Sequence, residues 1–446
     1  MAADVVTLAE VNLWGKTIGA VSWDAGRALA NFEYDPGFRH SGIELSPLVM
    51  PLSDRIYSFP ALSRESFKGL PGLLADSLPD AFGNALIDAW LARQGRDVES
   101  FNPVERLCYT GARGMGALEY LPAQGPVTSK AQVLDIEALV KLAGKILKQR
   151  NALEGSFAAP EREDSLNEIL RIGTSAGGAR AKAVIAWNKD TDEVRSGQVD
   201  AGQGFSYWIL KFDGVEGNRD KELEDPRGYG LIEFAYYKMA TAAKIRMKES
   251  RLLKENGRNH FMTKRFDRTD SGMKLHMQSL GALAHFDYRQ PGAWSYEQAI
   301  LTLRQLGLGT RAVEELFRRM VFNIIARNQD DHVKNISFLM NPAGQWMLSP
   351  AYDVTYSYNP NGSWTGQHQM SLNGKRDNFT LDDFRACARQ CSMARGRAEE
   401  IVAEVISTVA DWEYYATQAG VPEETTRKIK NAQRTDMPVV AQFENS

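Results

Sequence analysis

The chain has few cysteines and no long apolar run. Only three of its 446 residues are cysteine (Cys108, Cys387 and Cys391), which is too few for a disulfide framework and fits a reducing compartment. Cys387 and Cys391 lie one helical turn apart without further metal ligands beside them, so we interpret them as small buried helix residues. No apolar run is long enough to span a bilayer, and the N-terminus lacks the basic-then-apolar pattern of a secretory signal. The sequence therefore predicts a cytoplasmic protein with no membrane segment.

An excess of one charge is also missing. The chain has 53 Lys and Arg against 56 Asp and Glu, a formal net charge of -3. This balance excludes an extensive surface that coats nucleic acid, although a local basic patch is still compatible with it. The apolar and aromatic fractions are ordinary for a globular protein, and the length is enough for roughly two or three subdomains.

Hydrophobic periodicity predicts that a β-rich part precedes a mainly helical part. A pair of strands around Gly15-Lys16 and a third strand over 31–34 open the chain, and a composition shift near residue 125 indicates a boundary. Further strands are expected over 183–187, 206–212 and 260–267, and helices over 81–93, 134–149, 231–245, 296–305, 310–328, 380–392, 396–419 and 422–434.

The most informative stretch is a polar loop that follows one of these helices. Asp330 is followed five positions later by Asn335, just ahead of an apolar run that is typical of a strand. This is the spacing of a protein-kinase catalytic loop, in which the Asp receives the proton of the substrate hydroxyl and the Asn holds a metal ion. The alternative is a polar turn with no chemistry. We prefer Asp330 to its neighbour Asp331 as the base, because only Asp330 has an Asn five positions later.

A second metal-ligand candidate, Asp353, follows the loop. A predicted hairpin over 338–348 brings Asn335 and Asp353 to one end. Their amide and carboxylate oxygens suit Mg²⁺, which prefers few protein ligands together with phosphate oxygens and water. His332 and Lys334 either stabilise the loop or contact the transferred phosphate. The sequence therefore predicts transfer of phosphate from a nucleotide.

Two earlier segments offer groups for the nucleotide phosphates. Small residues from Gly173 to Ala179 let backbone N–H groups approach phosphate oxygens, and Arg180 or Lys182 adds charge. A glycine-rich hairpin connection is the alternative, because the segment lacks both the G-x-G-x-x-G and the Walker pattern. Lys211 ends a predicted strand, where a kinase lysine reaches the phosphates and Glu233 of the next helix could pair with it. A lone lysine at a strand end is, however, often only solvated.

Four short segments together resemble the HipA serine/threonine kinases, the toxin components of bacterial HipBA toxin–antitoxin modules. They are Leu73–Asp80, Lys264–Arg268, Asp330–Asn335 and Leu348–Asp353. The resemblance extends over essentially the whole chain and implies an α+β, two-lobed protein-kinase-like fold with an extra N-terminal β-rich subdomain and a mainly α-helical C-terminal lobe. The implied domains are the N-terminal subdomain over 1–125, the kinase N-lobe with its Gly-rich loop over 126–266, and the C-lobe with the catalytic loop over 267–446.

The resemblance also implies a role for each matching residue. Asp330 is the implied catalytic residue, Asn335 and Asp353 are the implied Mg²⁺ ligands, and ATP is the implied nucleotide. The residues expected to contact ATP are Lys211 and Lys182 at the phosphates, Lys264 and Phe266 of the hinge through their backbone, Ser175, Gly177 and Gly178 of the Gly-rich loop, and His332 and Lys334 of the catalytic loop.

Ser175 falls where HipA proteins carry an autophosphorylated serine, with Thr174 beside it as the alternative site. Phosphate there adds roughly two negative charges, ejects the loop and inactivates the kinase. The chain departs from the best-known member at Arg180-Ala181, Lys264 and Asp331. The hinge change matters little if the backbone makes the contact, whereas the loop change affects the detail of self-inactivation.

Members of the family phosphorylate proteins such as aminoacyl-tRNA synthetases and are bound by a small helix-turn-helix antitoxin of the HipB type. The resemblance implies both kinds of partner, with operator DNA contacted mainly through the antitoxin. Two alternatives stay open. One is a HipA-like kinase without toxicity that acts on another substrate, and the other is a catalytically silent kinase fold that serves as a co-repressor subunit.

Overall fold

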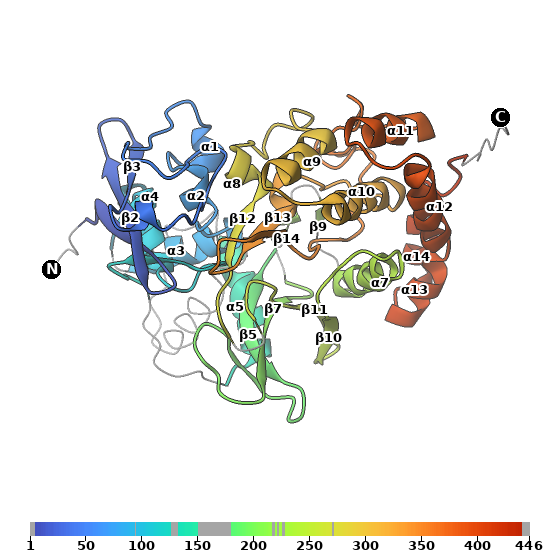
Figure 1. Ribbon diagram of the computed structural model, residues 1–446. Helices are drawn as coiled ribbons and strands as arrows, with labels where there is room; N and C mark the ends of the chain where they lie inside the picture. The colour runs from blue at the N-terminus through green and yellow to red at the C-terminus, as the bar shows by residue number, and fades with distance from the viewer. Residues whose placement is uncertain are drawn as a thin grey trace. The chain divides into compact units, whose positions relative to one another are not determined.

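The chain folds into two compact units of mixed α and β structure, seen in the computed structural model of Figure 1. The structure describes residues 5–93, 95–125, 133–149, 180–215, 219–220, 223–224, 228–269 and 272–438. Unit 1 comprises Met1–Gly230, Glu249–Gln278 and Leu339–Gln345, and unit 2 comprises Leu231–Lys248, Ser279–Phe338 and Trp346–Ser446. The predicted Gly-rich loop with Thr174, Ser175, Gly177 and Gly178 lies outside the described residues.

Unit 1 opens with an antiparallel sheet in the order β3-β2-β1-β4. Its strands are β1 (Leu8–Leu13), β2 (Lys16–Asp24), β3 (Leu29–Tyr34) and β4 (Leu118–Leu121). The β1–β2 turn centres on Trp14 and Gly15, which both have positive φ, 49° and 75°. Positive φ at both positions matches the right-handed twist of the flanking strands, so the turn lies one residue earlier than predicted. The same unit contains η1 (Phe38–His40), α1 (Arg64–Phe67), α2 (Gly72–Ala75), α3 (Ala81–Arg93), η2 (Val98–Ser100) and α4 (Pro103–Thr110).

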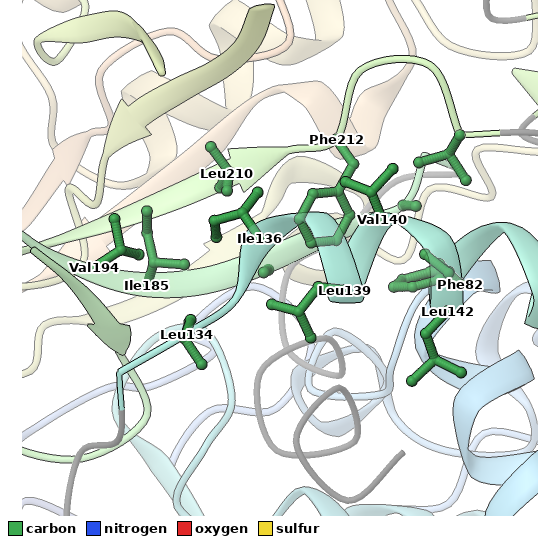
Figure 2. Packing of buried hydrophobic residues seen from close by; sticks show 14 of the residues in the cluster. Phe82, Leu134, Ile136, Leu139, Val140, Leu142, Ile185, Val194, Leu210 and Phe212 are labelled. Carbon is green, nitrogen blue, oxygen red and sulfur yellow. The ribbon is translucent and has the colours of Figure 1, made fainter. Parts of the chain in front are cut away.

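The second sheet of unit 1 has the order β10-β11-β7-β5-β6. Its strands are β5 (Lys182–Asn188), β6 (Val194–Ser196), β7 (Phe205–Lys211), β10 (Ser250–Glu255) and β11 (Arg258–Lys264), and the short pair β8 (Arg219–Asp220) and β9 (Leu223–Glu224) is separate. Helix α5 (Ile136–Gln149) packs on this sheet. Figure 2 shows Leu139 and Val140 of α5 against Ile185 and Leu210 of the sheet, with Phe82 of α3 in the same buried cluster. Burial of each such large apolar side chain contributes about 1.5–3 kcal/mol.

Unit 2 is mainly helical, as its amphipathic periodicity predicted. The helices are α7 (Tyr229–Ala242), which begins at the unit boundary, α8 (Leu280–Ala284), α9 (Tyr296–Gln305), α10 (Thr310–Ile325), α11 (Leu381–Gln390), α12 (Arg397–Ala410), α13 (Trp412–Ala419) and α14 (Glu423–Ala432). The predicted single helix over 396–419 is therefore two helices, because the chain tightens at Asp411, whose N–H bonds Thr408 O at 3.3 Å. Cys387 and Cys391 are buried at α11, as predicted.

A hairpin follows the polar loop, as predicted. The chain passes between the units within β12 (His276–Ser279) and β13 (Ser337–Met340), and β14 (Trp346–Leu348) follows. Asn341 N–H donates to Gln345 O at 3.2 Å at the turn, and Ser349 N–H donates to Ser337 O at 2.9 Å at the open end. In the part of the chain that the structure describes, no helix combines the length and apolarity that crossing a membrane requires.

Candidate active site

The polar loop begins where α10 ends, at a residue with unusual backbone geometry. Arg327 has φ 61°, which is uncommon for a residue other than glycine and ends the helix earlier than predicted. The guanidinium of Arg327 makes three contacts that stabilise this backbone conformation. Nε donates to Ala432 O at 2.6 Å, Nη1 donates to Gln329 Oε1 at 3.0 Å, and the group lies 4.2 Å over the ring of Tyr358. The direction in which the chain leaves α10 is thus fixed from several sides.

A side-chain bond closes the loop between the two residues that the spacing singled out. Asn335 Nδ2 donates to the backbone O of Asp330 at 2.8 Å, over the short turn η4 (Val333–Asn335). This use of the amide nitrogen leaves the amide oxygen as the atom that would ligate a metal ion. The Asp330 carboxylate has 19% of its side-chain surface exposed and accepts a hydrogen bond from Trp364 Nε1 at 2.6 Å.

Asp353 lies on the same small cavity of unit 2 as Asn335. The cavity has a volume of about 30 Å³ and is also lined by Asp331, His332 and Tyr352, whereas Asp330 does not line it. Asp353 has φ 52°, a second left-handed residue beside the loop. Tyr352 O–H donates to Lys334 O at 2.6 Å and so ties this segment to the loop.

The donor set fits a hard cation that needs few protein ligands. Within the described ranges, no group of three or more His, Cys, Asp or Glu residues could hold a metal ion. One amide oxygen and one carboxylate on a shared cavity are, however, the sparse oxygen set with which Mg²⁺ is bound beside phosphate. Asn335 and Asp353 therefore fit the predicted role as ligands.

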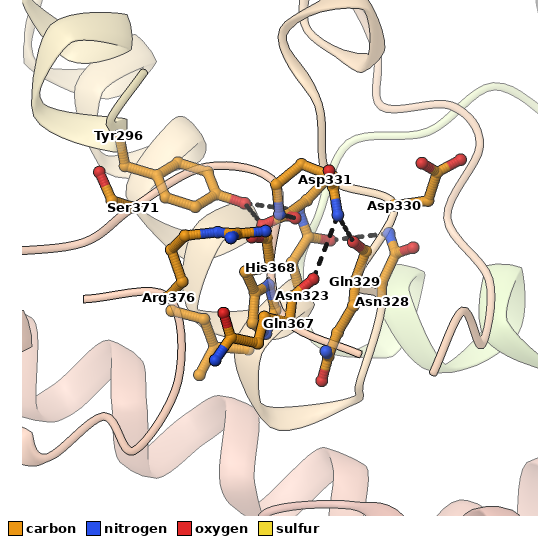
Figure 3. Close-up of polar contacts among 12 residues, drawn as sticks. Tyr296, Asn323, Asn328, Gln329, Asp330, Asp331, Gln367, His368, Ser371 and Arg376 are labelled. Atoms are coloured by element: carbon orange, nitrogen blue, oxygen red, sulfur yellow. Dashed lines mark hydrogen bonds and ion pairs between the residues drawn. The ribbon is translucent and has the colours of Figure 1, made fainter. Parts of the chain in front are cut away.

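The neighbouring carboxylate, Asp331, is a buried anchor (Figure 3). It accepts hydrogen bonds from Tyr296 O–H at 2.7 Å, His368 Nδ1 at 2.8 Å and the Gln369 N–H at 2.7 Å. Burial raises the pKa of Asp331, but His368 and these hydrogen bonds outweigh it and hold the pKa below its usual range. In Figure 3 the Asp330 carboxylate points away from this cluster.

The contact of His368 with Arg434 shows which ring nitrogen of His368 carries the proton. Arg434 Nη1 lies 3.1 Å from His368 Nε2, and a guanidinium only donates. Nε2 must therefore accept, so Nδ1 carries the proton that bonds Asp331. The roles of His368, Tyr296 and Trp364 escaped the sequence analysis because these residues lie outside any local motif. Asp331 itself was the available signal, since a second carboxylate in a loop needs partners.

His332 and Lys334 lie on the partly exposed side of the loop. His332 Nε2 is 3.9 Å from Asp330 Oδ1, and its ring centroid is 5.5 Å from that of Tyr288. Lys334 Nζ lies 5.1 Å from the centre of the same tyrosine ring. Contact of either residue with phosphate stays a prediction.

The predicted phosphate-binding lysines are opposite each other in unit 1. Lys182 of β5 and Lys211 of β7 are direct cross-strand partners. Lys182 is buried and lies 3.5 Å from Asp80, whereas Lys211 Nζ lies 5.8 Å from the centre of the Phe261 ring. Arg180 is also buried, with its guanidinium 3.7 Å over Tyr229. The sheet thus places the two lysines side by side, and Lys182 lies beside the Asp80 carboxylate.

The predicted hinge follows β11. Lys264 N–H donates to Glu249 O and Arg265 N–H donates to Tyr207 O, both at 2.9 Å, so the sheet uses two of the three backbone donors of the segment. Phe266 is buried. Contact of Lys264 and Phe266 with adenine stays a prediction, as does pairing of Lys211 with Glu233, which belongs to unit 2.

Comparison with known proteins places the chain in a family. Residues 174–412 match the family model described as HipA-like C-terminal domain, and residues 9–121 match the HipA N-terminal domain. The chain belongs to the HipA family. The predicted family and the predicted mixed α and β fold class are thereby confirmed, while the domain limits at 125 and 266 stay predictions.

A solved HipA structure has a similar fold. The chain is similar to HipA in the complex of the Shewanella oneidensis MR-1 toxin–antitoxin system HipA, HipB and operator DNA, with a TM-score of 0.65 and 16% identity over 95% of this chain and 94% of that one. It also matches the Helicobacter pylori proinflammatory kinase CtkA, with a TM-score of 0.30 and 11% identity over 48% of this chain and 90% of that one. No curated protein sequence matches the chain.

Proposed function

We propose that this protein is a HipA-like serine/threonine kinase that transfers the γ-phosphate of ATP to a protein hydroxyl. The observation that carries the proposal is the closed loop in which Asn335 bonds the backbone of Asp330 while sharing a cavity with Asp353. Asp330 would accept the hydroxyl proton, and Asn335 and Asp353 would hold Mg²⁺. When bound, Mg²⁺ neutralises charge on the phosphates.

Lys211 and Lys182 would supply positive charge to the phosphates from unit 1. Their direct cross-strand pairing supports this role, because it places the two lysines beside each other on one sheet. Lys264 and Phe266 would contact adenine, and Ser175 would be the autophosphorylated residue of the Gly-rich loop, with Gly177 and Gly178 beside it.

The biological role that we propose is that of the toxin in a toxin–antitoxin pair in the cytoplasm. The family match supports it, and the similar Shewanella HipA is in complex with HipB and operator DNA. The partners would be a HipB-like antitoxin, operator DNA mainly through that antitoxin, and a protein substrate such as an aminoacyl-tRNA synthetase.

Labelled ATP with Mg²⁺, added to the purified protein alone and with cell lysate, tests the chemistry. We expect label on the protein and on a lysate protein, with Ser175 among the mapped sites. Asp330→Asn should lower the transfer rate by about 10²–10⁴-fold, the usual worth of a general base, and Asp353→Ala should also suppress it. Asp382→Asn, an exposed carboxylate of α11, is the matched control and should keep the wild-type rate.

Two results would change the proposal. If the wild-type protein neither binds Mg-ATP nor transfers label, the kinase assignment fails and a silent co-repressor subunit is the better account. If transfer occurs but expression does not arrest growth, the protein is a kinase without toxicity. Growth arrest that disappears with Asp330→Asn supports the toxin role.

A further inference from the structure

An indole N–H reaches the carboxylate of the candidate base. Trp364 Nε1 donates to Asp330 Oδ1 at 2.6 Å, across 34 residues of sequence. The Trp364 ring also lies 6.5 Å from the ring of His332, which is itself 5.5 Å from that of Tyr288. The carboxylate thus sits beside partly exposed aromatic side chains, and Trp364 makes a directed contact to it.

The segment that carries Trp364 is bound to the loop residues on both sides of Asp330. Gln329 Nε2 donates to Thr365 O at 3.1 Å, and Gln369 Nε2 donates to Trp364 O at 2.5 Å. Gln329 and Gln369 are both buried. Together with the bond from the Gln369 N–H to Asp331, these contacts join three consecutive loop residues to 364–369. The segment that carries Trp364 is therefore held by the same loop whose carboxylate it contacts.

We propose that Trp364 is a positioning residue for the proposed phosphoryl transfer. The torsion that rotates a carboxylate about its last carbon–carbon bond is soft, so an unanchored Asp samples many orientations. The Trp364 N–H holds Oδ1 and thereby fixes the plane of the group in the orientation in which it would receive the proton. Alignment of this kind lowers the barrier because the reacting groups are already in place.

The step itself balances without any further reactant. The acceptor O–H bond breaks and its proton moves to the Asp330 carboxylate. The hydroxyl oxygen forms a bond to the γ-phosphorus of ATP, and the bond from that phosphorus to the bridging oxygen breaks, so that ADP leaves with the electron pair. This inference rests on the proposed function, and Trp364 acts only through Asp330.

Trp364→Phe is the variant that isolates the indole N–H, because it keeps an aromatic ring. The matched control is Trp294→Phe in the same unit, where Nε1 donates to the backbone O of Asp287 at 2.8 Å and the ring stacks on Phe286 at 4.0 Å. The rate is measured as transfer from labelled Mg-ATP to the acceptor mapped by the labelling experiment. Nucleotide binding is measured separately as the thermal shift that Mg-ATP produces.

With Trp364→Phe we expect kcat to fall by about tenfold or more, the rate equivalent of one hydrogen bond to a charged group. The KM for ATP and the Mg-ATP thermal shift should stay at wild-type values, since the contact would be used for orientation and not for binding. Trp294→Phe should keep the wild-type kcat.

The other outcomes separate the inference from the function beneath it. An active wild-type protein whose Trp364→Phe variant has an unchanged kcat overturns the positioning role alone. A raised kcat also overturns it and makes the contact an inhibitory one. A parallel loss of Mg-ATP binding, or an equal loss in Trp294→Phe, reduces Trp364 to a structural residue. A wild-type protein that transfers no phosphate refutes the proposed function, and the positioning role falls with it.

Discussion

Adjacent carboxylates of one loop have different environments, and the difference supports the separate roles that we propose for them. The Asp331 side chain is 1% exposed and accepts bonds from Tyr296, His368 and the backbone of Gln369. Asp330 is more exposed and is contacted by an indole N–H. A carboxylate that is saturated with donors is a poor proton acceptor, so Asp331 is suited to hold the loop and Asp330 to react.

Asp331→Asn should therefore destabilise the protein. The substitution removes a buried charge from its donors and sets an NH₂ group against one of them, which costs roughly 2–4 kcal/mol. Urea unfolding at neutral pH measures the loss, and Asp382→Asn, at an exposed position of α11, should stay within about 0.5 kcal/mol of wild type. If Asp331→Asn kept full stability and still abolished phosphate transfer, Asp331 would be the base and our assignment of Asp330 would be wrong.

Asp331 should also make the free energy of unfolding depend on pH in the acid range. The pKa of Asp331 is lower in the folded protein than in the unfolded chain, so its contribution is present above about pH 4 and is lost as the pH falls below that value. Asp331→Asn should remove this part of the acid destabilisation.

For single residues, the spacing in the sequence was enough to predict some members of the candidate site but not others. The interval from Asp330 to Asn335 was readable because a short turn brings the two together. The partners of Asp331 lie 35 to 38 residues away. No periodicity connects such positions, so only the folded chain reveals Tyr296, His368 and Trp364.

At the scale of elements, the segment that follows α14 is joined to the end of α10 through Arg434. Arg434 N–H donates to Ile325 O at 2.9 Å, and its Nη1 donates to Ile324 O at 3.1 Å. The same guanidinium donates to His368 Nε2 and pairs with Asp377. Burial lowers the pKa of Arg434 to about 10, which leaves it charged at neutral pH. The segment that follows the C-terminal helix thus supports the loop through His368.

Arg434→Ala should loosen this support. We expect a loss of about 2 kcal/mol in the free energy of unfolding, because His368 Nε2 and Asp377 lose a buried partner. Phosphate transfer should slow several-fold with an unchanged KM for ATP. Arg427→Ala is the control, since Arg427 lies in α14, the helix that precedes Arg434, is exposed and pairs only with Glu423 among the contacts described. Equal effects of both variants on the transfer rate would show that α14 and not the Arg434 contact matters.

Elements with strong periodicity were predicted closely, and irregular segments were not. Helix α9 has the predicted limits, and α3 does as well. The break between α12 and α13 was missed because both carry apolar residues at helical spacing. The segment over 355–380 contains no helix or strand, so nothing in its pattern could place Trp364 or His368 beside the loop.

At the scale of the whole molecule, a buried ion pair couples the N-terminal part of unit 1 to its second sheet. Asp80 precedes α3 and Lys182 begins β5, and their side chains are 5% and 3% exposed. Burial raises the pKa of Asp80 to about 6, although Lys182 and the N–H of Gly83 act in the opposite direction. The cost of removing the Asp80 carboxylate from water therefore exceeds its attraction to Lys182 at 3.5 Å. Ionisation of Asp80 thus lowers the free energy of unfolding.

The protein should consequently lose stability as the pH rises from about 4 to about 6. In that window the unfolded chain releases the proton of Asp80 while the folded chain still holds it, so deprotonation favours unfolding by roughly 2–3 kcal/mol. Urea unfolding across this range should show the slope in wild type and a flatter curve in Asp80→Asn, which is neutral throughout. Asp54→Asn, an exposed site of the same unit, should keep the wild-type slope. A curve for Asp80→Asn that matches wild type would mean that Lys182 stabilises the Asp80 carboxylate enough to cancel the cost of burial.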